Sequence, residues 1–418
     1  MTGQTPAPDP YRTVAEQYVK LVLAVGQHDG DYVDAFYGPP EWRKEAEAGK
    51  KPLETIDAQA AATEAALAAI VVKPDPNDAE MWALRRQYLT RQLAAVRTRV
   101  AMLQGKALTF DQESMALYDA VAPVKPEAEF QAVLALLSAR LPGDEPLIDR
   151  YDRFKQAFVI PTNRVGRVFS EAIRACRDRV PHALNLPVSE RFTVEYVTGK
   201  SWSGYNWYQG DFKSLIQVNT DLPVYIDRAV DLACHEGYPG HHVYNVLLEK
   251  NLVQDRGWIE YTVYPLFSPQ SLIAEGTANY GIEVAFSPAD RLTFERDVLF
   301  PLAGLDPKRV IEYYDVMALV DRLSYAGNEA ARQYIDGKID RAAAIAWLEK
   351  YALYTKPRAE QRLKFIEQYR SYVINYNLGK DLVRSYVEAK VGRDNVTVRR
   401  WREFTALLSS PRLPSGLK

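Results

Sequence analysis

The chain has 418 residues and carries 52 Lys and Arg against 54 Asp and Glu, a formal net charge of −2. This balance argues against a nucleic-acid-binding protein, which needs a basic surface, and against an acidic solvating tail. Apolar residues make up 47% and charged residues 25%, the composition of an ordinary folded protein in water. Two cysteines are too few for a disulfide framework, and no apolar run approaches the roughly 18–20 residues of a membrane span.

The N-terminal part of the sequence predicts a loose leader followed by helices. Residues 1–10 contain three prolines and few apolar groups, which favours a flexible leader. They lack the basic start and apolar segment of a signal peptide, so we expect a cytoplasmic protein, with a removed export signal as the alternative. Residues 11–185 predict a helical region, because 56–70 hold eight alanines and apolar groups recur every three or four residues within 82–103.

Residues 186–418 predict a second, catalytic region that begins with a small β-sheet. Two runs rich in β-branched and aromatic residues, 192–197 and 214–219, flank a glycine- and aromatic-rich connection and predict two strands at a working surface, or an ordinary hairpin. The helical pattern then resumes. Pro357 is suited to the start of a long last helix that runs past Tyr376, with Gly379 as the expected kink.

Three of the five histidines lie within eight residues, at His235, His241 and His242, and Glu236 follows the first. His-Glu followed by a histidine one helical turn later is typical of zinc hydrolases. Six residues separate His235 from His241, about 600° of regular helix, so the two would point to different faces. The intervening Pro239-Gly240 pair favours a local bulge that would correct this. We therefore predict His235 and His241 as ligands, with His242 as the alternative.

A zinc site of this type needs a third protein ligand and an open position. Glu275 lies in a segment of small residues, Glu275-Gly-Thr-Ala-Asn-Tyr280, where a neighbouring helix could approach closely. It is the predicted third ligand, and Glu283 is a weaker alternative.

These segments resemble a bacterial family known as domain of unknown function 885. The shared motifs are H-E-x-x-P-G-H, at 235–241, and E-G-x-A-x-Y, at 275–280. Similarities also occur at 372–380 and in the closing segment at 404–410. The family is similar to zincin metallopeptidases. The resemblance implies a mainly α, zincin-like helical metallohydrolase with a small β-sheet beside the active-site helix.

The resemblance further implies one zinc ion on His235, His241 and Glu275, with Glu236 as the base; manganese, cobalt or nickel are alternatives. One position departs from related zincins, in which an acidic residue four positions after the glutamate ligand orients a histidine. Here that position is Asn279, so the orienting role would pass to Asp231 or another carboxylate.

The expected reaction is hydrolysis of a peptide or small amide, in which Glu236 takes a proton from a metal-bound water that attacks the carbonyl. An oxyanion donor is expected from the opposite wall. Three tyrosines are candidates for it: Tyr205, Tyr372 and Tyr376. The alternatives are hydrolysis of an ester or cyclic amide, an inactive zincin fold that binds a peptide or protein, and a helical scaffold without metal. The sequence carries no signal for the oligomeric state.

The run 214–219 is suited to an edge strand that pairs with an extended peptide. Its residues Ile216 and Val218, and the aromatic residues Trp207 and Tyr208 of the connection, are therefore candidates for substrate binding. Arg370 or Lys380 is a candidate for neutralising a substrate carboxylate.

Overall fold

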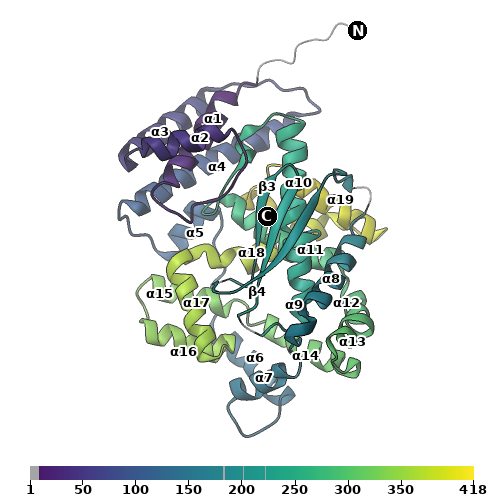
Figure 1. Ribbon diagram of the computed structural model, residues 1–418. Coiled ribbons are helices and arrows are strands. Elements are labelled where there is room, and N and C mark those ends of the chain that lie inside the picture. The colour runs from purple at the N-terminus through teal and green to yellow at the C-terminus, as the bar shows by residue number, and fades with distance from the viewer. Residues whose placement is uncertain (1–8, 182–183, 201, 222) are drawn as a thin grey trace.

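The computed structural model describes residues 9–181, 184–200, 202–221 and 223–418, and most of them are helical (Figure 1). The expected mainly α character is confirmed. The expected leader lies largely outside the described residues. Within the described residues, no helix is both long and apolar enough to cross a membrane.

The elements before the central sheet are α1 (Arg12–Val25), β1 (Val33–Phe36), α2 (Pro40–Gly49), α3 (Leu53–Ala69), α4 (Ala79–Leu103), α5 (Phe110–Tyr118), α6 (Glu127–Arg140), α7 (Leu147–Gln156) and α8 (Thr162–Asp178). The sheet and the helices of the candidate site are β2 (Arg191–Val197), β3 (Gly204–Gly210), β4 (Lys213–Asn219), α9 (Asp227–Leu232), the π-helical turn η2 (Ala233–Gly237), α10 (His241–Leu248), the π-helical turn η3 (Glu249–Gln254), the 3-10 turn η4 (Ile259–Thr262), β5 (Val263–Pro265) and α11 (Pro269–Ala285).

The remaining elements are α12 (Pro288–Phe294), the π-helical turn η5 (Glu295–Leu299), α13 (Phe300–Ala303), the 3-10 turn η6 (Pro307–Arg309), α14 (Val310–Asp321), α15 (Ala326–Ile335), α16 (Arg341–Ala352), α17 (Lys356–Tyr369), the 3-10 turn η7 (Arg370–Val373), α18 (Ile374–Val391), α19 (Val396–Leu408) and the 3-10 turn η8 (Pro414–Leu417).

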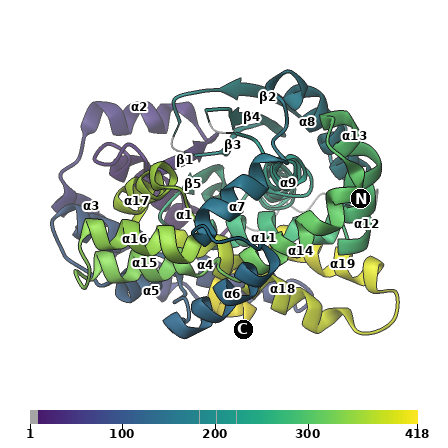
Figure 2. The ribbon, with the colours of Figure 1, turned by 90° about the horizontal axis from the view of Figure 1, so that it is seen from below.

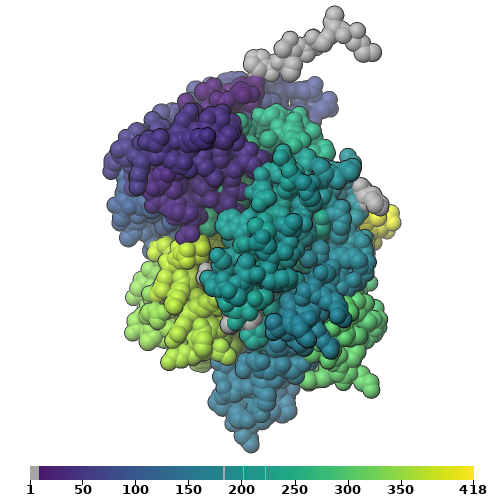
Figure 3. Space-filling model, viewed as in Figure 1, coloured from purple at the N-terminus to yellow at the C-terminus, as the bar shows by residue number. Residues whose placement is uncertain are grey.

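The N-terminal region contains a strand that the sequence did not indicate. β1 pairs antiparallel with β5, more than 200 residues later in the chain, and the register shifts between Val33 and Ala35. Such a bulge turns the side chain of the extra residue, here Asp34, away from the regular alternation. In Figure 3 the surface formed by the β2–β4 segment borders both the N-terminal helices and the α16–α17 segment. Segments far apart in sequence therefore meet around the sheet.

The larger sheet corrects the prediction for 192–219. Its strand order is β2–β4–β3, with β2 parallel and β3 antiparallel to β4. The glycine- and aromatic-rich connection is thus itself a strand, and β2 and β4 do not form a hairpin. β4 lies in the centre of the sheet, because the connection folds back onto its free side. Figure 2 shows α9 between this sheet and α11.

α11 and α18 pack closely against each other. A Cβ atom placed on Gly276 would lie 2.5 Å from the backbone carbonyl carbon of Gly379, so the two backbones meet where neither residue has a side chain. Gly379, where a kink was expected, lies inside α18 and serves this contact. The long last helix is instead interrupted at Arg370, whose φ is 51°, and continues as η7 and α18.

Candidate metal centre

The histidine motif leaves its helix for three residues and then returns to helical structure. η2 ends at Gly237, and α10 begins at His241. The intervening turn is closed by a hydrogen bond from the Gly240 backbone N–H to the Cys234 carbonyl at 2.9 Å. A Cβ on Gly240 would lie 1.8 Å from the His235 carbonyl oxygen. Only glycine fits at this point, and the turn sets the direction of the next residue, His241.

The turn brings three donor atoms together. His241 Nε2 lies 3.1 Å from His235 Nε2. Glu275 Oε2, from the middle of α11, lies 3.3 Å from His235 Nε2 and 3.8 Å from His241 Nε2. The bulge expected at Pro239-Gly240 therefore has the predicted geometric effect.

The spacing of these atoms suits a tetrahedral ion. Bonds of about 2.0–2.1 Å at tetrahedral angles place neighbouring ligand atoms roughly 3.3 Å apart. In addition, Glu275 Oε2 is buried and has no hydrogen-bond partner among the described residues. A buried carboxylate oxygen without a partner is costly, and a cation between it and the two imidazoles would satisfy it. The residues present therefore fit a zinc ion.

Glu236 also lies close to the two histidines. One donor atom from each of His235, Glu236 and His241 falls within 4.8 Å of the others. Two carboxylates are thus available to one ion. The Glu275 oxygen is the better ligand, because it faces both Nε2 atoms and lacks any other partner. That leaves Glu236 free to act on a substrate or a water.

Asn279 takes the orienting role that the sequence left open. Its Oδ1 lies 3.2 Å from His235 Nδ1, and its Nδ2 donates to the Tyr376 carbonyl oxygen at 3.2 Å. The carbonyl oxygen of an amide can only accept, so the proton of His235 is held on Nδ1 and Nε2 is left as a lone-pair donor. Asp231 does not take this role, because it pairs with Arg291 at 2.8 Å. Asn279 thus acts as an acidic residue would at the same helical spacing.

Glu236 lies in a closed environment. Burial raises the pKa of its carboxyl to about 7, a value suited to a general base near neutral pH. Asn206, on β3, donates to the Glu236 backbone carbonyl at 2.7 Å. A Cβ on Gly204 would lie 2.8 Å from Glu236 Oε1, so the beginning of β3 borders the carboxylate directly.

The two histidines differ in how readily they take up a proton. Burial lowers the pKa of His241 to about 4, which keeps its imidazole neutral at physiological pH. Burial opposes protonation of His235 as well, but Glu236 and Glu275 outweigh it and raise its pKa. The charge on Glu275 is held by its neighbours, since His235 and His241 lower its pKa against the effect of burial.

His242, the alternative ligand, has another task. It is fully buried, its Nδ1 lies 2.9 Å from Ser214 Oγ, and its Nε2 lies 2.8 Å from Glu190 Oε2. Both nitrogens are therefore used, and His242 joins α10 to β4. The prediction of His242 as a fallback ligand is wrong, because a residue adjacent to His241 on a helix points about 100° away from it.

The three candidate tyrosines have different partners. Tyr372 donates to Glu275 Oε1 at 2.8 Å and so orients the predicted ligand. Tyr205 donates to Asp34. The Tyr376 hydroxyl has no hydrogen-bond partner among the described residues, and its pKa is raised by burial, Glu275 and Glu236. Of the three, only Tyr376 keeps its proton free for an oxyanion.

The candidate substrate-binding residues need correction. Ile216 and Val218 are buried at 4% and 2% exposure, because they project from β4 toward the core, and both edges of that strand are already paired. Tyr208 is buried and donates to Glu249 at 2.6 Å. Trp207 remains exposed and donates to Gln217 on the neighbouring strand at 3.1 Å. Of the four, only Trp207 lies on an open surface, and the edge strands are β2 and β3.

The prediction that Arg370 or Lys380 neutralises a substrate carboxylate is also wrong, because both already pair with carboxylates of the protein. Arg370 Nε lies 2.6 Å from Glu113, and Lys380 Nζ lies 3.0 Å from Glu283. Glu283, the alternative third ligand, also pairs with Arg384. These groups neutralise one another away from the three donor atoms.

Two features of the site carried no signal in the sequence. Asp34, at the β1 bulge, is held by Tyr205, and burial raises the pKa of its carboxyl to about 7. Cys234, next to His235, forms a disulfide with Cys176 of α8, 58 residues away in sequence. The disulfide ties η2 to α8. Neither pairing follows from spacing, because both join distant segments.

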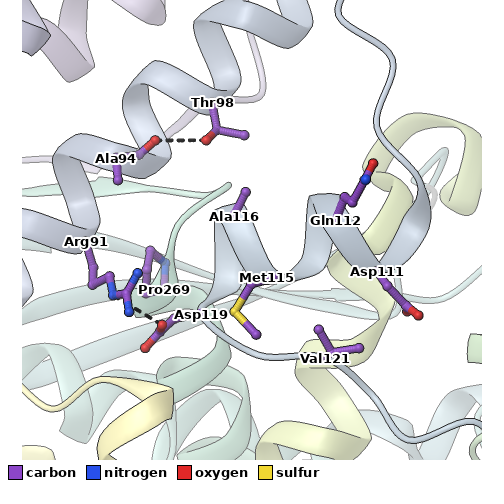
Figure 4. A pocket seen from close by; sticks show the side chains of 10 residues that line it. All are labelled: Arg91, Ala94, Thr98, Asp111, Gln112, Met115, Ala116, Asp119, Val121 and Pro269. Carbon is purple, nitrogen blue, oxygen red and sulfur yellow. Dashed lines mark hydrogen bonds and ion pairs between the residues drawn. The ribbon is translucent and has the colours of Figure 1, made fainter.

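A surface pocket between α4 and α5 is separate from these groups (Figure 4). Its charged residues are already engaged, with Arg91 Nε 3.3 Å from Asp119. The Thr98 hydroxyl donates to the Ala94 carbonyl of its own helix at 2.9 Å. These satisfied groups leave nothing in the pocket that calls for a ligand.

The comparisons with known proteins give the fold alone. No family model and no curated protein matches the chain. A solved structure described as a putative lipoprotein from Colwellia psychrerythraea is similar, with a TM-score of 0.52 and 13% identity over 99% of this chain and 75% of that one. A structure described as BsuCP matches at a TM-score of 0.44 and 10% identity, over 96% of this chain and 87% of that one. The second likeness is too low to carry an argument, and the first shows a shared overall fold.

Proposed function

We propose that this protein is a zinc-dependent hydrolase, most plainly a peptidase, with His235, His241 and Glu275 as ligands and Glu236 as general base. The observation that carries the proposal is the convergence of His235 Nε2, His241 Nε2 and the unpartnered Glu275 Oε2 at 3.1–3.8 Å. The resemblance to the zincin-like family points to the same residues. When bound, zinc supplies a Lewis acid that polarises a carbonyl and acidifies water.

The chain's own residues supply the remaining steps. Glu236 accepts the proton of the attacking water and later gives it to the leaving amine. The Tyr376 hydroxyl, which has no hydrogen-bond partner in the part of the chain that the structure describes, donates to the developing oxyanion. Tyr372 and Asn279 hold Glu275 and His235 in place.

The edge of β3 is the natural place for an extended peptide. β3 is one of the two terminal strands of the sheet, and it begins beside Glu236. A peptide that hydrogen-bonds along a free strand edge is fixed in register, which would carry its scissile bond past the carboxylate. Trp207, exposed on this strand, would contact its side chains.

The disulfide bears on where the protein works. Disulfides persist in oxidising compartments and are rare in the reducing cytosol. We therefore propose an oxidising compartment in place of the cytoplasmic location expected from the sequence. A thiol titration of the denatured native protein tests this: no free thiol supports it, and two free thiols contradict it.

The function is tested by Glu236→Gln, with Glu47→Gln on the exposed face of α2 as the matched control. Zinc-loaded proteins are given a pool of N-acetylated tripeptides, and cleavage is followed by mass spectrometry. Loss of a general base lowers the rate by about 10²–10⁴, so Glu236→Gln should lose turnover and keep its zinc. Full activity of Glu236→Gln would refute the role of Glu236 as general base. Zinc binding without any turnover by the wild type would favour an inactive, peptide-binding fold.

A further inference from the structure

One nitrogen of the Arg362 guanidinium, on α17, lacks a hydrogen bond. Its Nε is buried and meets no acceptor among the described residues. Two other arginines have an unpartnered Nε, but their terminal nitrogens are engaged: Arg150 binds Ser138, and Arg412 binds Glu80. The Arg362 guanidinium lies over the aromatic rings of Phe365 and Tyr376. Unsatisfied polar groups of this kind are rare in folded proteins and call for an explanation.

Aromatic rings connect the Arg362 guanidinium to the candidate metal centre. The central carbon of the guanidinium is 4.9 Å from the Phe365 ring and 5.9 Å from the Tyr376 ring. The Tyr376 ring is 5.8 Å from that of Tyr372, which hydrogen-bonds to Glu275. The pKa of Tyr376 is raised by Glu275 and Glu236 and lowered by Arg362. Its hydroxyl therefore lies in the electrostatic range of all three groups.

We propose that Arg362 binds the C-terminal carboxylate of the substrate, so that the enzyme cleaves close to the C-terminus of a peptide. This inference rests on the proposed function and narrows it to a carboxypeptidase-type reaction. Water adds its hydroxyl to the carbonyl carbon, the amide C–N bond breaks, and the proton passes to the leaving amine.

The chemistry of arginine favours this ligand. The planar guanidinium fork matches a carboxylate through two parallel hydrogen bonds. The Phe365 and Tyr376 rings flank the guanidinium, an arrangement that favours a cation. A carboxylate held by Arg362 would lie beside the ring whose hydroxyl is the proposed oxyanion donor.

Charge supports a specific role for Arg362, since the other cations considered are neutralised. Arg370 and Lys380 have carboxylate partners at 2.6 Å and 3.0 Å. Lys364, on the exposed side of α17, has no partner among the described residues. The substitution Lys364→Gln is therefore a matched control, because it removes one positive charge from the same helix at a side chain that does not face the site.

The test measures binding, so that it does not depend on turnover. Zinc-loaded, full-length protein with Glu236→Gln is dialysed against a pool of N-acetylated tripeptides, in free-acid and in C-terminal amide form. We expect the acids to bind at least tenfold more tightly than the amides. Adding Arg362→Gln should abolish that preference, Arg362→Lys should retain part of it, and Lys364→Gln should leave it unchanged. Thermal unfolding of each variant checks that it is folded.

Three results would overturn the inference: equal binding of acids and amides, a preference that survives Arg362→Gln, or no binding of either pool. Turnover by protein with an intact Glu236 separates this inference from the proposed function. An Arg362-dependent preference without hydrolysis would leave the carboxylate site standing and refute the hydrolase. Hydrolysis of acids and amides at equal rates would support the hydrolase and refute the carboxylate site.

Discussion

Replacing Asn279 by alanine removes the side chain that holds His235. The amide makes two contacts, with His235 Nδ1 and with the Tyr376 carbonyl, each at 3.2 Å. Bonds at this long end of the usual range contribute about 0.5–1.5 kcal/mol each. Their joint loss, about 1–3 kcal/mol, corresponds to roughly a 5- to 150-fold weaker zinc affinity, since about 1.4 kcal/mol is tenfold. Loss of an orienting partner typically weakens metal binding by about 10–100-fold.

The assay is competition for zinc against a chromogenic chelator at fixed pH. Asn251→Ala is the control, because Asn251 makes a similar amide-to-carbonyl bond to Leu247, at 2.8 Å, away from the three donor atoms. Asn279→Asp keeps an acceptor for His235 and adds negative charge, so its affinity should match or exceed that of the wild type. An Asn279→Ala protein with wild-type zinc affinity would refute the orienting role.

Three further predictions concern stability. Gly276→Ala should lower the free energy of unfolding in urea by about 1–3 kcal/mol, because the new Cβ would lie 2.5 Å from the Gly379 backbone. The control Gly49→Ala, whose Cβ would have nothing within 4 Å, should not lower it. Equal effects of the two substitutions would contradict the close contact. Glu190 has its pKa lowered to about 2, because its hydrogen-bonding partners outweigh burial. A lowered carboxyl pKa adds stability above the unfolded pKa of about 4.3, which is lost as the pH falls toward 2. The difference in unfolding free energy between wild type and Glu190→Gln should therefore shrink as the pH falls through this range. A difference that stays constant would contradict the lowered pKa of Glu190. Reducing the disulfide, whose cysteines are 58 residues apart, should lower the free energy of unfolding by about 4 kcal/mol in the chain-entropy model; an unchanged melting temperature after complete reduction would rule this out.

The local geometry of the histidine motif could be predicted because it depends on neighbouring residues. Six residues of helix separate His235 from His241 by the wrong angle, and Pro239-Gly240 is the kind of pair that interrupts a helix. The structure places the interruption there. The helices and their apolar faces could also be predicted, because hydrophobic periodicity is a local property of the sequence.

Pairings between distant segments could not be predicted. The runs at 192–197 and 214–219 were recognised as strands, but which of them lies at the edge depends on how the connection folds back. A connection rich in aromatic residues forms β3 and closes the free side of β4. The prediction for Ile216 and Val218 failed for that reason, and Asp34, on a strand paired more than 200 residues away, gave no local sign.

Asn279 shows a third case, in which the position was found and its role was missed. The spacing from Glu275 marked it as the orienting position, but because its side chain is neutral we expected Asp231 or another carboxylate to take the role. A neutral amide oxygen accepts the same hydrogen bond. The general signal is the helical spacing of a hydrogen-bond acceptor, and charge is not required.

The metal content of the protein tests the central claim most directly. Wild type, His235→Ala and His28→Ala are purified without added metal and then dialysed against micromolar zinc. His28 is the control, because it is only partly buried and its Nε2 pairs with the Lys51 carbonyl oxygen at 2.7 Å. The account predicts close to one zinc per chain in wild type and in His28→Ala, and a large loss in His235→Ala. Wild-type protein that binds no zinc under these conditions, or His235→Ala that binds as much as the wild type, would contradict it.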